Sequence, residues 1–132
     1  MLEYEPKILL AFGEAINGNE KIFSWLLNNG YPELAALAWS IRGSDEAFKW
    51  LLNNSFPHLA ALDSAIDNSE RAYQWLRDNN FMFLVVFADA CHGQPKAINW
   101  LRENDLEIFV RLGLTVKKLR DSQTFDYHKI HF

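Results

Sequence analysis

The sequence lacks most of what a disulfide-stabilised, loop-rich or membrane-spanning protein needs. It holds one cysteine, Cys91, so it can form neither an intramolecular disulfide nor a cysteine-rich zinc site. Six glycines and four prolines among 132 residues are too few for a loop-rich or β-rich fold. The longest apolar run covers residues 81–88, whereas a helix that spans a bilayer needs about 20 residues.

Positive charge is also scarce. The 13 basic residues are outnumbered by 17 acidic ones, which gives a net charge of −4 and a pI near 5.5. This balance disfavours non-specific binding to nucleic acid. Glu3 and Glu5 stand where a signal peptide would carry positive charge. We therefore expect a cytoplasmic protein with neither a nucleic-acid nor a membrane partner.

Apolar and aromatic residues are plentiful. Apolar residues make up 49% of the chain, and 10 Phe, 5 Trp and 4 Tyr all favour burial, which indicates one packed domain over residues 1–132. Leucine and alanine are abundant, whereas valine and threonine are rare. That balance favours helices over strands.

Tryptophan recurs at a fixed interval, which reveals an internal repeat. Four tryptophans are spaced 25 residues apart without insertion or deletion, and a leucine follows each: Trp25, Trp50, Trp75 and Trp100. The repeats cover residues 7–31, 32–56, 57–81 and 82–106, and a degenerate capping repeat covers residues 107–132.

Each repeat is expected to form two short helices. In the first, Leu9, Phe12 and Ile16 have the spacing of one helical face, and apolar residues recur at the same three positions of every later repeat. Four residues mark the N-cap of the second helix: Asn19, Ser44, Ser69 and Gln94. Four more mark its left-handed C-terminal residue: Gly30, Ser55, Asn80 and Asp105. Hairpins this short cannot bury their apolar faces alone, so we predict an all-α fold, a right-handed α-α superhelix (solenoid) of stacked αα-hairpins with a 25-residue period.

Residues 9–30 resemble the two helices of an ankyrin repeat, through the turn at residues 18–20 and the Leu-Leu-x-x-Gly ending. The Thr-Pro-Leu-His motif of that family is missing from every copy, and the shorter period leaves no residues for the β-turn loops. The resemblance implies an architecture of stacked helix pairs and binding of a protein partner.

Two positions of the repeat are expected to form structural ladders. The tryptophans should line up as a buried ladder through the stack. An asparagine follows four residues after each tryptophan, where its amide can bond to free carbonyls at a helix end or to the backbone of the next repeat. Ligand binding by these amides is the alternative. They are Asn29, Asn54, Asn79 and Asn104.

No catalytic, phosphate-binding or metal-binding signature is recognisable, so we expect no cofactor, no metal and no enzyme activity. Cys91 occupies an aliphatic position of the repeat and should be a buried structural thiol. A degenerate enzyme domain that uses Asp63, Asp89 and His92 is the alternative. A cleft in which these three side chains converge would favour it.

The stripe opposite the core face of the first helices is the candidate binding surface. It is flanked by small residues such as Ala35 and Ala60, which predicts an inner surface with a groove. We expect a non-catalytic protein–protein interaction or scaffold module that uses this inner face. The alternative is a pocket for a small ligand or peptide in the curve of the stack. Trp39 is the proposed anchor of a partner that carries basic groups, with Arg42, Glu14, Asp67 and Asp89 nearby.

Repeat four is more apolar than the repeat requires, at Phe83 and Val86. The C-terminal cap could cover these side chains, or they could form a contact between two copies of the chain. The protein is therefore expected to be a monomer or a weak homodimer. The basic C-terminal segment is expected to be a terminal cap, with a partner-binding tail as the alternative.

Overall fold

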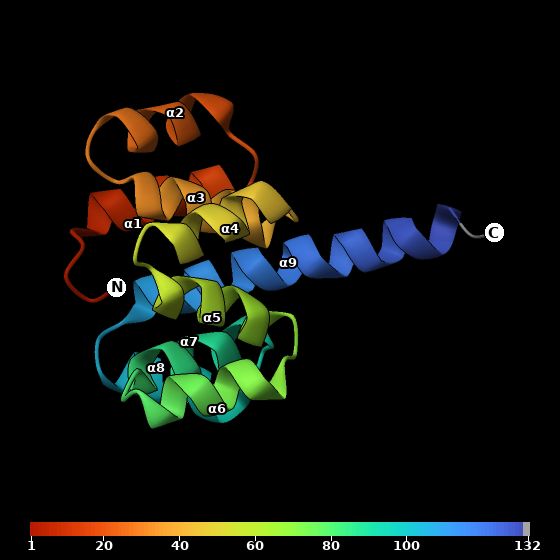
Figure 1. The fold of residues 1–132 in the computed structure, drawn as a ribbon. Helices are drawn as coiled ribbons and strands as arrows, with labels where there is room; N and C mark the ends of the chain where they lie inside the picture. The colour runs from red at the N-terminus through yellow and green to blue at the C-terminus, as the bar shows by residue number, and fades with distance from the viewer. Residues whose placement is uncertain (131–132) are drawn as a thin grey trace.

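The computed structural model confirms an all-α fold (Figure 1). It describes the backbone of residues 1–130 and the side chains of residues 1–123. Nine helices and no strand lie in residues 1–130. They are α1 (Pro6–Ile16), α2 (Glu20–Asn28), α3 (Pro32–Ile41), α4 (Asp45–Asn53), α5 (Pro57–Ile66), α6 (Glu70–Asp78), α7 (Met82–Cys91), α8 (Pro95–Glu103) and α9 (Glu107–Ile130).

Side-chain caps begin three of the second-layer helices, as the sequence predicts. Asn19 accepts a hydrogen bond from the Ile22 amide at 3.1 Å and so caps α2. Ser44 and Ser69 cap α4 and α6 in the same way. These bonds satisfy amides that would otherwise lack a partner in the first turn. Gln94 makes no such bond at the start of α8.

Left-handed residues end the same helices, which confirms the predicted C-terminal positions. Gly30 has φ +93°, and the amide of the next residue, Tyr31, bonds back to the Leu26 carbonyl at 3.0 Å. This is a Schellman turn, and its usual apolar contact is here a stack of Tyr31 on Trp25. The equivalent residues after α4, α6 and α8 also have positive φ: Ser55, Asn80 and Asp105.

The helices form two layers. The inner layer consists of α1, α3, α5, α7 and α9, and each of these helices contacts the next. Each of α2, α4, α6 and α8 lies outside and bridges two inner neighbours. Helix α9 also packs against α1, so the inner layer closes on itself (Figure 1). We expected a stack with an open inner face; closure fills that face with side chains instead.

The predicted core positions are buried in all five repeats, including the degenerate one. Phe12, Leu37, Leu62 and Phe87 are fully buried, and Leu112 is 4% exposed. Cys91 is 1% exposed, as its aliphatic position predicts. Burial of this kind supplies most of the stability of helices that are individually too short to persist in water.

The tryptophans differ from the expected buried ladder. Trp25, Trp75 and Trp100 are 44%, 37% and 43% exposed, and each of Trp25 and Trp75 stacks on the aromatic residue six positions later. The neighbouring Leu26 and Leu76 are fully buried instead. The reason is rotational. Adjacent residues of a helix point about 100° apart, so only the leucine faces the inner layer.

The four ladder asparagines bond within their own helices. The Asn54 amide donates to the Trp50 carbonyl at 2.8 Å, and the side chain is exposed. The same bond recurs at 2.7–2.8 Å for Asn29, Asn79 and Asn104. These amides therefore finish helix C-termini and do not join one repeat to the next.

Helix α9 is the described part of the capping repeat. It is a single helix of 24 residues, and all of them belong to that one repeat of the sequence. Its Phe109 ring meets Phe83 edge-to-face at 4.9 Å, so α9 partly covers the apolar side of α7. Val86 is half-buried. Residues 131 and 132, the end of the predicted capping repeat, lie outside the described residues. Among the helices described, none combines the length and hydrophobicity that crossing a bilayer requires.

Candidate functional site

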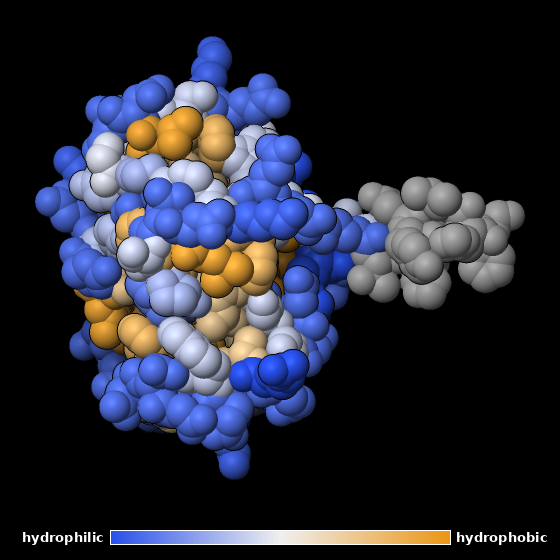
Figure 2. Space-filling model, viewed as in Figure 1, coloured by the Kyte–Doolittle hydropathy of each residue, from blue (hydrophilic) through white to orange (hydrophobic). Residues whose placement is uncertain are grey.

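The stripe that holds Trp39 forms the floor of grooves between second-layer helices. The grooves exist because these helices bridge inner neighbours without packing on each other. Figure 2 shows apolar side chains between polar ridges on this face of the molecule. In one groove the floor residue is Trp39, and in another it is Asp89, fifty residues later. The same position of the repeat thus produces one apolar groove and one polar groove.

The Trp39 groove lies between α2 and α4, with α3 beneath it, and has a volume of about 260 Å³. Trp39 is half-buried, and its ring meets Phe23 of α2 edge-to-face at 4.9 Å. That contact fixes the indole while leaving part of it open to solvent. The remaining lining residues are mainly apolar and come from α2, α3 and α4 and their turns: Leu27, Pro32, Ala36, Ser44, Glu46, Ala47 and Trp50.

Arg42 also contacts the Trp39 ring. Its guanidinium carbon lies 5.4 Å from the centre of that ring, a cation–π contact. Its Nη1 donates to the Ile16 carbonyl at the C-terminus of α1, at 2.9 Å. A positive group is favoured there by the helix dipole. Arg42 therefore positions Trp39 and is not itself free to meet a partner, and its buried Nε has no hydrogen-bond partner in the described part of the chain.

The rim of the Trp39 groove is acidic. Glu46 lines the groove from the first turn of α4 and is exposed. Within residues 1–123 it forms no ion pair. Ser44 also lines the groove, but its hydroxyl already caps α4. The site therefore offers an apolar floor with one unpaired carboxylate beside it.

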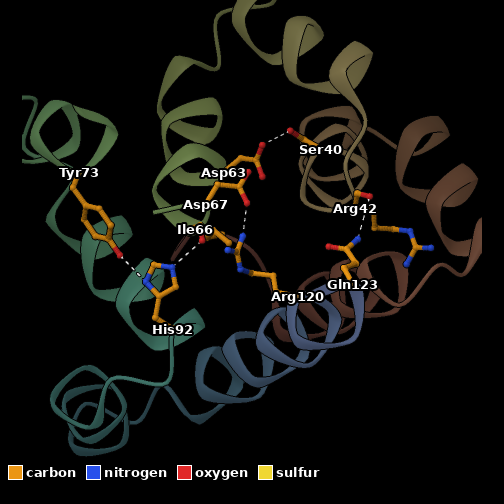
Figure 3. Close-up of polar contacts among 9 residues, drawn as sticks. All are labelled: Ser40, Arg42, Asp63, Ile66, Asp67, Tyr73, His92, Arg120 and Gln123. Carbon is orange, nitrogen blue, oxygen red and sulfur yellow. Dashed lines mark hydrogen bonds and ion pairs between the residues drawn. The ribbon is translucent and has the colours of Figure 1, made fainter. Parts of the chain in front are cut away.

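The polar groove centres on Tyr73 of α6 (Figure 3). The Tyr73 hydroxyl lies 3.0 Å from an Asp89 carboxylate oxygen and 3.1 Å from His92 Nδ1. His92 Nε2 lies 2.8 Å from the Ile66 carbonyl, so this nitrogen must carry a proton to donate. Burial, together with the hydrogen bond to Asp89, raises the pKa of Tyr73 well above its ordinary value. Tyr73 therefore stays protonated and acts as a hydrogen-bond donor.

Asp63 belongs to a different cluster. It is 6% exposed, and one carboxylate oxygen accepts a hydrogen bond from the Ser40 hydroxyl at 2.6 Å (Figure 3). Burial raises the pKa of Asp63 to about 6, although the Ser40 bond opposes this. Asp89 and His92 meet at Tyr73, and Asp63 does not join them. The three residues of the alternative enzyme hypothesis thus share no single contact network.

The other acidic residues of the predicted binding set are dispersed. Asp67 pairs with Arg120 of α9, which extends alongside the C-terminal ends of the inner helices (Figure 3). Glu14 lies on α1, at the groove that α1 forms with α9. Of the five predicted residues, the structure brings together only Trp39 and Arg42.

The small residues expected to line an inner groove are part of the core. Ala35 is fully buried and Ala60 is 2% exposed, because helices of both layers pack around the inner helices that carry them. Burial raises the pKa of the Cys91 thiol, which disfavours the nucleophilic thiolate form. The grooves that remain lie on the outside of the molecule, between second-layer helices.

Sequence reasoning missed the second-layer half of the Trp39 groove, formed by Phe23, Leu27 and Ala47. A usable signal existed. Leu27 and Leu52 directly follow the buried leucine of their helices and point away from the core, which leaves them 47% and 49% exposed. Apolar residues at a position that needs no burial mark a surface that an apolar group can contact.

Comparison of the chain with known protein families, with curated proteins and with solved structures finds no match.

Proposed function

We propose that the chain is a non-catalytic protein-interaction module, built as a solenoid of αα-hairpins with a 25-residue period. The second-layer helices support the period, since they begin at Glu20, Asp45, Glu70 and Pro95. Contact between α1 and α9 closes this solenoid. Partners must then bind on its outside.

The observation that carries the proposal is the half-buried Trp39, which contacts both Phe23 and Arg42 at the floor of an apolar groove. A tryptophan that is fixed in place loses little conformational entropy on binding, and such residues dominate binding energy in interfaces. The partner we propose is a protein segment with one or two apolar side chains for the groove. A basic side chain beside them would pair with Glu46.

The test compares three versions of the tagged full-length protein in affinity purification from its native cell. They are the wild type, Trp39→Ala and Trp100→Ala. Trp100 is the matched control, since it is an exposed tryptophan that does not line this groove. A partner retained by the wild type and by Trp100→Ala, but lost by Trp39→Ala, supports the proposal.

Purified components then give the magnitude. Trp39→Ala should weaken the partner's binding by about 2 kcal/mol, roughly thirtyfold in Kd. Glu46→Lys should weaken it by a smaller factor and leave thermal unfolding unchanged. Equal affinity of the wild type and Trp39→Ala would reject the Trp39 groove as the binding site.

A further inference from the structure

One junction of the inner layer has no second-layer helix over it. The junctions α1–α3, α3–α5, α5–α7 and α7–α9 are bridged by α2, α4, α6 and α8, each nine residues long. The fifth junction, between α9 and α1, has no bridging helix among the described residues. A closed layer with five junctions and four covering helices leaves one apolar seam open.

The exposed fraction of the side chain at one position of the repeat shows the effect of the missing helix. Ala35, Ala60, Val85 and Val110 are between 0% and 5% exposed, because a preceding second-layer helix covers each of them. Leu10 of α1 occupies the same position and is 55% exposed. On the other side of the seam, Ile108 of α9 lines the groove with α1 and is half-buried. The sequence therefore places at Leu10 a side chain larger than alanine or valine, and this side chain stays uncovered.

Residues 1–130, whose backbone the structure describes, do not supply the covering helix. At the turn after the fifth inner helix, Lys118 stands where earlier repeats have glycine or asparagine, and Leu119 replaces the N-cap residue. Without these signals α9 continues as one helix away from the seam (Figure 1). The positions that carry the buried apolar residues of a second-layer helix are also polar in this repeat: Ser122, Gln123 and Asp126.

Two charged side chains line the seam, one on each helix. A groove of about 110 Å³ between α1 and α9 is lined by Leu10, Ile108 and Leu112, with Glu14 on the α1 side and Arg111 on the α9 side. Arg111 replaces alanine or valine of the earlier repeats. Neither Glu14 nor Arg111 forms an ion pair with a residue in the described part of the chain.

We propose that this seam binds one amphipathic helix of a partner protein, about nine residues long, in the place of the absent second-layer helix. It would carry a small or apolar side chain at positions i, i+1 and i+4, as α8 does with Ala97, Ile98 and Leu101. Second-layer helices run back along the preceding inner helix. The bound helix would therefore direct its positive N-terminal end toward Glu14 and its C-terminal end toward Arg111, which the helix dipole favours.

A synthetic peptide of residues 94–106 is the probe, because it contains that apolar pattern, a lysine near its start and acidic residues near its end. Fluorescence anisotropy of the labelled peptide is measured against full-length wild type, Leu10→Lys and Leu52→Lys. Leu52 is the matched control, since it is a leucine of similar exposure on α4. Circular dichroism checks that all three proteins are folded.

The proposal predicts saturable binding to the wild type, at least tenfold weaker binding to Leu10→Lys, and binding to Leu52→Lys within twofold of the wild type. Glu14→Lys should weaken binding, and the peptide with Lys96→Glu should restore it. No saturable binding to the wild type, or equal binding to Leu10→Lys, overturns the proposal. So does a wild-type dimer in light scattering that Leu10→Lys dissociates, because a second copy would then occupy the seam. The seam shares no lining residue with the Trp39 groove, so the two sites are tested separately.

Discussion

The substitution Asp63→Asn, which replaces a buried carboxylate by an amide, should stabilise the protein at neutral pH but not at acidic pH. Asp63 is 6% exposed, and its burial raises its pKa from an ordinary 3.8 to about 6. The folded chain therefore holds this proton at pH values where the unfolded chain has released it. Stability due to Asp63 falls as the pH rises from about 4 to about 6 and stays low above that window.

The magnitude follows from the two pKa values. A pKa difference of one between folded and unfolded chains corresponds to about 1.4 kcal/mol, so ionised Asp63 costs the folded state about 3 kcal/mol. Asparagine keeps an oxygen that can accept the Ser40 hydrogen bond and cannot ionise. The stability of Asp63→Asn relative to wild type should therefore rise by about 2.5 kcal/mol between pH 4 and pH 7.5, because the unfolded chain is already partly ionised at pH 4.

Urea unfolding of both proteins at several pH values measures this rise. The test is how the stability difference between Asp63→Asn and wild type changes with pH. Any effect of the new amide on packing or hydrogen bonding is the same at every pH and cancels in that change. Asp78→Asn is the control, since this carboxylate is exposed and bonds, within residues 1–123, only to the exposed Gln74 side chain, so its loss should change stability little at any pH. A stability difference between Asp63→Asn and wild type that does not vary with pH would refute the reasoning.

Three further predictions concern the helices. Leu76→Ala should lower the free energy of unfolding by about 2–5 kcal/mol, and Trp75→Ala by no more than about 1.5 kcal/mol. The reason is that the leucine is fully buried, whereas the tryptophan is 37% exposed. Equal losses in urea unfolding would show that the tryptophan is part of the packed core. Gln94→Ser should add the missing cap of α8 and raise the free energy of unfolding by about 0.5–1 kcal/mol, whereas Ser69→Ala should lower it by about 1 kcal/mol. Melting temperatures that shift in the same direction for both variants would contradict this. Gly113→Ala should destabilise by about 1–3 kcal/mol, because the new methyl group would lie 3.1 Å from backbone atoms of Ala90. Gly13→Ala meets only a flexible methyl group of Leu112 and should be neutral or stabilising by up to about 1 kcal/mol; the reverse order of melting temperatures would show that α1 and α9 are packed differently.

Local signals in the sequence predict the helices and their ends well. Ser44, Ser69 and Gly30 act within a few residues of themselves, so their capping and turn roles can be recognised without knowledge of the fold. The apolar positions of the inner helices are buried in every repeat, because a face repeated with helical spacing has to pack somewhere.

Features that depend on the summed geometry of the repeats could not be predicted in this way. Closure between α1 and α9 depends on a small rotation added at each repeat, which no single residue specifies. The exposure of Trp75 depends on which side of a nine-residue helix faces inward, a matter of one residue in register. The Trp39 groove likewise requires that second-layer helices stand apart, so its lining from α2 and α4 emerges only from the assembled structure.

The contact between the first and last inner helices tests the account most directly, because closure is the reason for proposing that a partner binds on the outside of the molecule. A methyl carbon built on Gly13 would lie 3.1 Å from a Leu112 methyl group, so an α proton of Gly13 lies against that methyl group. We predict a strong nuclear Overhauser effect between the Gly13 α protons and the Leu112 methyl protons in the full-length protein. The contact of Phe87 with Phe109, on neighbouring inner helices, serves as the internal reference. Cross-peaks between Phe87 and Phe109 without any between Gly13 and Leu112 would show an open stack and contradict the account.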